Sequence, residues 1–110
     1  MHMAKTGSNA EMGYVIASHQ VTLQKKRIGY LYREAPDNDL DSGWRVFSGE
    51  ESQEYVDNAA NFSMYNSSTI AALAPEIALL LAHPSPIAFE RDPSSGRFVE
   101  VLPPPQSDEA

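Results

Sequence analysis

Alternating apolar and polar residues predict β-strands in the first half of the chain. Residues 13–18 are mostly apolar, β-branched or aromatic, which is typical of a buried strand. Residues 28–34 and 44–49 alternate between two sets of side chains, the period of a strand with two different faces. The connection between them, residues 35–43, is rich in turn-forming residues. We therefore expect the second and third strands to form an antiparallel hairpin with a long acidic loop.

The second half of the chain predicts short helices followed by two strands. Ser48 is a candidate N-cap for a helix over residues 49–58, whose early glutamates suit the positive end of the helix dipole. Pro75 is suited to open a helix, because its missing N–H costs little at that position. The other expected elements are a short extended piece (62–68), two short helices (68–83) and strands at 87–91 and 97–102.

Together these elements predict one small α+β domain, a mainly antiparallel sheet with short helices packed on one face. The domain is expected to span residues 13–102. We expect residues 1–12 to be a flexible N-terminal tail and residues 103–110 to be a disordered, proline-rich acidic tail. A chain of 110 residues is long enough to bury one such core.

The charge balance narrows the range of partners. The formal net charge is −7, and eight of the fifteen acidic residues lie between Glu34 and Asp57. Such a surface repels nucleic acid and attracts a basic protein. The chain shows no apolar secretory segment and no apolar run of roughly 20 residues that could span a bilayer. We therefore expect a cytoplasmic protein that binds neither nucleic acid nor membrane.

Candidate catalytic and metal chemistry is sparse. The absence of cysteine excludes disulfides, thiolate catalysis and cysteine-bound zinc. The spacing of Asp37, Asp39 and Asp41 is similar to the start of a calcium loop, which requires glycine at its sixth position and glutamate at its twelfth. Those positions hold Ser42 and Ser48. The three histidines lack the spacing of a zinc site. We predict no catalytic residue, no metal site and no cofactor.

Four aromatic residues lie on neighbouring expected strands: Tyr30, Tyr32, Trp44 and Phe47. Their acidic surroundings argue against the stacking of nucleic-acid bases, which needs basic neighbours. Packing in the core is the favoured interpretation. A second interpretation stays open, in which Trp44 at the mouth of the acidic loop anchors a protein interface.

Three linked motifs carry a family resemblance. They read G-Y-x-Y-R-E-x-P-D at 29–37, D-S-G-W-R-x-F-S-G-x-E at 41–51 and Y-x-D-N at 55–58. The pattern resembles a bacterial family described as domain of unknown function 2185 or the immunity protein 33 family, over about residues 13–92. The chain departs from the family's usual small turn at Ile87 and Ala88. The resemblance implies a non-enzymatic cytosolic protein of interbacterial competition, which neutralises a toxin by binding it.

Two hypotheses follow from this resemblance and from the residues. The first is an immunity protein that binds a basic toxin, because toxins that cut nucleic acid have basic clefts. Its predicted partner-binding residues are Asp37, Asp39, Asp41, Trp44, Arg45, Glu50, Glu51 and Glu54. Within this set the D-S-G-W-R motif is either a structural turn, with Asp41 accepting backbone N–H bonds, or part of the interface. The alternative is a small-ligand-binding or regulatory domain with a pocket formed by Arg33, Arg45 and the aromatic face.

Overall fold

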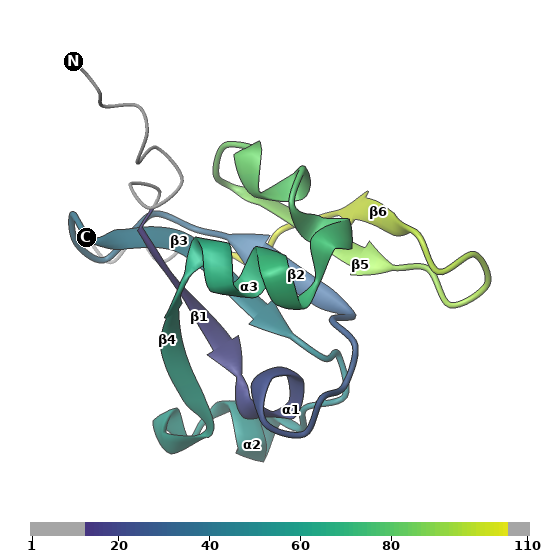
Figure 1. Cartoon of the computed structure of the whole chain (residues 1–110), viewed down its shortest axis with the longest axis horizontal. Coiled ribbons are helices and arrows are strands. Elements are labelled where there is room, and N and C mark those ends of the chain that lie inside the picture. Colours follow the sequence, from purple (N-terminus) through teal and green to yellow (C-terminus); the bar gives the residue numbers. More distant parts are fainter. Residues whose placement is uncertain (1–12, 106–110) are drawn as a thin grey trace.

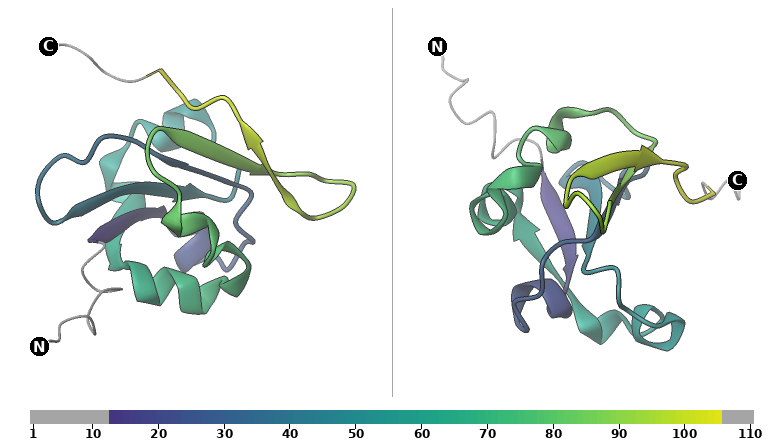
Figure 2. Two further views of the ribbon diagram at one scale, coloured as in Figure 1. Left: turned by 90° about the horizontal axis from the view of Figure 1, so that it is seen from above. Right: turned by 90° about the vertical axis from the view of Figure 1, so that its right-hand side faces the viewer.

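The structure, a computed structural model, describes residues 13–105 (Figures 1 and 2). The predicted N-terminal tail lies outside the described residues. Of the predicted C-terminal tail, residues 103–105 are described and residues 106–110 lie outside. The described residues form a single sheet with several short helices (Figure 1), so the α+β class is confirmed.

The sheet of the described residues has six strands in the order β4-β1-β3-β2-β5-β6. Four neighbouring pairs are antiparallel, and β1 with β3 is parallel. The predicted β2–β3 hairpin is confirmed, and the β5–β6 hairpin projects at one side of the molecule (Figures 1 and 2). The strands are β1 (Tyr14–Ser18), β2 (Tyr30–Arg33), β3 (Asp41–Phe47), β4 (Phe62–Asn66), β5 (Ile87–Arg91) and β6 (Phe98–Val101).

The third strand begins three residues earlier than the sequence predicted. Residues 41–43 read as a turn, yet they belong to β3, where Tyr14 of β1 pairs with Asp41. Gly43 is at φ +89°, a backbone conformation that favours glycine, so this part of the strand is irregular. A turn-like sequence is therefore built into the central strand of the sheet.

All described helices are short: α1 (His19–Thr22), α2 (Gln53–Val56), α3 (Ser67–Leu73) and the 3-10 turns η3 (Ala59–Asn61), η4 (Pro75–Ile77) and η5 (Leu80–Ala82). The first of the two helices predicted over 68–83 is confirmed as α3. The second is wrong as a continuous helix, because it consists of the separate turns η4 and η5. None of the helices in residues 13–105 has the length and apolar character needed to cross a bilayer.

The helix predicted over residues 49–58 is shorter and begins later. Gly49 is at φ +94°, outside the helical region, so no helix can continue directly from Ser48. Helix α2 starts instead after Ser52, whose hydroxyl accepts the N–H of Tyr55 at 3.1 Å. Glu51 and the residue before it therefore precede the helix rather than forming its first turn.

The core lies between the central strands and the segments that follow β4. Leu31, Trp44 and Val46 are fully buried, and they belong to one cluster with Ile70 of α3 and Ile77 of η4. Each such side chain stabilises the fold by roughly 1.5–3 kcal/mol relative to its exposed state. That all the helices pack on one face of the sheet remains a prediction, since α2 contains no buried residue.

Candidate partner-binding surface

Arg45 of β3 is buried among carboxylates. Its guanidinium makes a two-pronged ion pair with Asp41, with both N···O distances 2.8 Å. Its Nε donates to Glu34 at 2.7 Å, and Asp37 lies 3.8 Å away. The side chains of Arg45 and Asp41 are 6% and 0% exposed. Gly43 lies between the two partners at φ +89°, and the pairing of β1 with β3 is irregular there, so the ion pair forms across an irregular stretch of the strand.

Asp41 also holds the backbone of its own loop. One carboxylate oxygen accepts the N–H of Gly43 at 2.9 Å and the other accepts the N–H of Asp37 at 2.8 Å. The first of these bonds confirms the predicted Asx-turn. Burial alone would raise the pKa of Asp41, but the hydrogen bonds from Arg45 and the backbone outweigh it and lower the pKa to about 2. The same pairing raises the pKa of Arg45 against the effect of burial.

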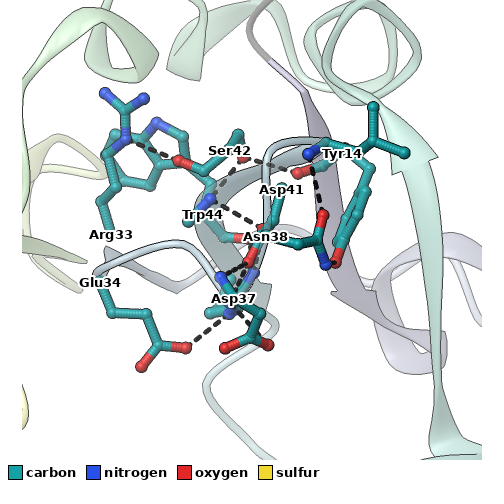
Figure 3. A network of polar contacts seen from close by, with 11 residues as sticks. Tyr14, Arg33, Glu34, Asp37, Asn38, Asp41, Ser42 and Trp44 are labelled. Carbon is teal, nitrogen blue, oxygen red and sulfur yellow. Dashed lines mark hydrogen bonds and ion pairs between the residues drawn. The ribbon is translucent and has the colours of Figure 1, made fainter. Parts of the chain in front are cut away.

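The acidic loop, residues 34–40, is fixed by further hydrogen bonds to β1 (Figure 3). Tyr14 donates its N–H to the carbonyl of Leu40 at 2.8 Å, and its hydroxyl accepts from Asn38 at 3.1 Å. The Ser42 hydroxyl donates to the carbonyl of Tyr14 at 2.6 Å. Leu40 itself is 73% exposed. Hydrogen bonds therefore fix the ends of the loop, while its tip is exposed to solvent.

Gly43 is required at the base of this loop. Its φ of +89° is unfavourable for other residues, and a Cβ at this position would collide with the carbonyl oxygen of Glu34. The N–H of Glu34 donates to the carbonyl of Gly43 at 2.9 Å, so the two backbones are in direct contact. The glycine of the D-S-G-W-R motif is thus explained by close packing of the backbone.

Trp44 is a core residue. It is fully buried, and its indole N–H donates to the carbonyl of Leu81 at 3.0 Å. The guanidinium of Arg33 lies 5.7 Å from the centre of its ring, and Arg33 also donates to the carbonyls of Ser42 and His83. Of the two interpretations of Trp44, the structure supports core packing. Its burial leaves no surface through which it could contact a partner.

The structure does not form the pocket of the alternative hypothesis. Cross-strand pairing matches Arg33 with Trp44 and Tyr32 with Arg45. Since neighbouring residues of a strand point to opposite faces, Arg33 and Arg45 lie on opposite sides of the sheet. Both guanidinium groups are already bonded to internal acceptors. Nothing in the described residues supports a shared arginine pocket.

The predicted acidic residues lie in two separate places. The first group, Asp37 and Asp39, precedes β3, and the second group, Glu50, Glu51 and Glu54, follows it. The seven residues of β3 separate the two groups along the chain. We call these groups the loop acids and the helix acids. The acids that cluster in the sequence are thus divided between the two ends of β3.

These acids differ in how strongly they are already bonded. The Asp37 side chain is 73% exposed, and Asp39 and Glu54 are also exposed. Glu50 forms an exposed ion pair with Lys26 at 2.6 Å. Glu51 is half-buried and accepts the N–H groups that follow β3, at 2.8 and 3.0 Å. Burial opposes its ionisation, but hydrogen bonds outweigh it and lower its pKa.

The aromatic residues of the other sheet face form a second feature near the acids. The rings of Tyr30, Tyr32 and Phe47 lie 5.8–5.9 Å apart, and Phe62 and Tyr55 extend the row at 5.7 and 6.1 Å. The strand pattern of the sequence indicated the first three residues. Phe62 and Tyr55 could not be predicted from it, because only the pairing of β4 with β1 and the position of α2 bring them to this face. We call this row the aromatic face.

No metal site is formed by residues 13–105: they contain no group of three or more histidine, cysteine or acidic side chains able to hold an ion. His19 Nε2 lies 2.8 Å from the hydroxyl of Ser63. His83 packs edge-on against Phe89, with ring centres 5.2 Å apart. Within the described part, each of these histidines therefore has a structural contact.

The fold and site define a small α+β domain in which a buried ion pair holds an acidic surface loop. Residues 15–102 match the family model described as the immunity protein Imm33 domain, so the chain belongs to this family. The family resemblance found in the sequence is thereby confirmed. Membership points to a role in toxin immunity, and immunity proteins of this kind are generally not enzymes. Neither the curated proteins nor the solved structures contain a match.

Proposed function

We propose that this protein is a non-enzymatic immunity protein of the bacterial cytoplasm, which binds and neutralises a cognate toxin through its exposed acids. Family membership is the observation that carries the proposal. The exposed carboxylates of Asp37, Asp39 and Glu54 supply the chemistry for a basic partner. Asp41, Trp44 and Arg45 are left out of the contact surface because they are buried.

The two groups of acids suit the physical task of such a protein. A net charge of −7 steers a basic partner toward the domain and speeds its association. A typical interface needs about 800 Å² from each partner, a small share of the 6696 Å² of accessible surface. The buried ion pair of Asp41 with Arg45 keeps the loop acids in a fixed arrangement, which reduces the ordering cost of binding.

The test uses a candidate toxin, sought among the products of the genes beside the gene for this protein. Co-expression of the protein should restore growth of cells that produce the toxin. The affinity of the purified pair should fall with added salt, because charge attraction between exposed groups is screened. Asp39→Lys and Glu54→Lys should each lower the association rate by about tenfold at low salt.

The matched control for these variants is Glu100→Lys, the same change of charge on the exposed surface of β6. It should leave association close to that of the wild-type protein. Absence of growth protection would refute the immunity role. Protection with an affinity that neither salt nor the two variants change would refute the acidic surface while leaving the immunity role in place.

A further inference from the structure

A groove of about 460 Å³ runs along the aromatic face beside α2. Tyr30, Tyr32 and Phe47 form its aromatic wall, and Val56 of α2 also lines it. These rings are half-buried rather than covered, and Val56 is 37% exposed. The groove is therefore an apolar surface that the described residues leave open to a partner.

The charged residues that line this groove are acidic. Glu90 of β5 pairs directly with Tyr30 across the sheet, and its side chain is exposed. No ion pair in residues 13–105 involves Glu90. Glu51 lines the groove as well and remains charged because hydrogen bonds lower its pKa. Within residues 13–105, neither lysine nor arginine lines this groove.

An aromatic wall beside two carboxylates is suited to bind a positively charged side chain. The face of an aromatic ring attracts a positive charge, and the attraction grows where water is excluded. Arginine suits such a site better than lysine, because its flat guanidinium stacks on rings and donates two parallel bonds to a carboxylate. Arginine is also among the residues that most often dominate binding energy at protein interfaces.

We propose that this groove receives an arginine side chain of the cognate toxin, stacked against Tyr30 and Phe47 and paired with Glu90. The proposal rests on the proposed function and gives it an anchor point. The helix acids lie close by, since Glu51 belongs both to that group and to the lining of the groove. A basic toxin steered by the helix acids would thus meet the groove directly.

The first test measures toxin binding with two variants of the full chain. Glu90→Lys places a positive charge in the groove and should weaken binding of the toxin by at least about tenfold. Glu100→Lys is the matched control, because Glu100 pairs with Phe89 and so lies on the opposite face of the same hairpin. It should bind within about twofold of the wild-type protein, since rim charges away from the contact change affinity little.

The second test needs no toxin. N-acetyl-arginine amide is titrated into the protein while the ring signals of Tyr30 and Phe47 are followed by NMR. N-acetyl-citrulline amide, which has the same shape without the charge, is the comparison. We expect saturable shifts with the arginine probe in the wild-type protein and in Glu100→Lys. The shifts should be lost in Glu90→Lys and should be several-fold weaker with citrulline.

Together, the two tests show whether the arginine groove or the immunity role is wrong. Equal toxin binding by Glu90→Lys and the wild-type protein would overturn the arginine groove and leave the immunity role intact. If the wild-type protein binds no toxin, the proposed function fails and the arginine probe decides the groove alone. In that case, a saturable shift that Glu90→Lys removes supports the groove, whereas no shift, or an equal shift with citrulline, overturns it.

Discussion

The substitution Asp41→Asn tests the buried ion pair by removing a charge with little change of shape. The pKa of Asp41 is about 2, against an ordinary 3.8. At about 1.4 kcal/mol for each pKa unit, the ionised form contributes about 2 kcal/mol to the free energy of unfolding. The variant also leaves Arg45 with Glu34, at 2.7 Å, as its nearest charged partner. We expect a loss of about 2–4 kcal/mol at pH 7.

The effect of Asp41→Asn on the free energy of unfolding should depend on pH in a defined direction. Because the pKa of Asp41 is lower in the folded state, its contribution is fully present above the unfolded pKa and is lost as the pH falls toward the folded pKa. By pH 3, about half of the contribution, roughly 1 kcal/mol, should be gone. The Asp41→Asn variant has no proton to bind at this position. The gap in stability between the wild-type protein and the variant should therefore narrow by about 1 kcal/mol from pH 7 to pH 3.

Urea unfolding measured at both pH values provides the assay. Trp44 is the only tryptophan and is fully buried, so its fluorescence reports the loss of the core. The matched control is Asp39→Asn, two residues away in the exposed loop, which should change the free energy of unfolding by less than about 0.5 kcal/mol. A wild-type level of stability in Asp41→Asn at pH 7 would refute the reasoning. So would a gap that stays constant between the two pH values.

Three further substitutions test the surroundings of the ion pair, each by urea unfolding at pH 7. Gly43→Ala forces a positive φ on alanine and a collision with the carbonyl of Glu34. It should lower the free energy of unfolding by about 2–4 kcal/mol. A loss under about 1 kcal/mol would contradict a fixed backbone at this position. Trp44→Phe leaves the carbonyl of Leu81 without its donor and should cost about 1–3 kcal/mol, with circular dichroism as the probe. Leu40→Ser alters an exposed side chain and should change stability by less than about 0.5 kcal/mol.

Strand periodicity in the sequence predicted much of the fold, because the strands have two different faces. The alternation separated the two faces correctly, and core packing is right for Trp44, which is fully buried. It is wrong for Tyr30, Tyr32 and Phe47, which are only half-buried on the other face. The start of β3 at Asp41 could not be found this way. Its pairing with Tyr14 joins segments 27 positions apart in the chain, and the strand begins with residues that favour turns. Local patterns do not carry such long-range pairing.

The predicted helix after Ser48 shows how a local signal can be only partly realised. Ser48 is followed three residues later by Glu51, the pattern of a capping box. The carboxylate of Glu51 does accept the N–H of Ser48 at 2.8 Å, as in that motif. No helix continues directly from Ser48, because Gly49 adopts a positive φ, and α2 starts only after Ser52. The sequence also could not predict how the acidic residues are arranged. Acids that lie close together in the sequence are attached to opposite ends of β3.

The parallel pairing of β1 with β3 has a consequence for selectivity. It places β3 inside the sheet, bonded on both sides, so the strand cannot lengthen or shorten without disturbing its neighbours. The loop acids and the helix acids are attached to its two ends. The sheet therefore fixes the positions of the two groups relative to each other. A partner that engages both groups must carry positive charges in two places with a matching spacing. A partner with the same total charge but another spacing could satisfy only one end at a time.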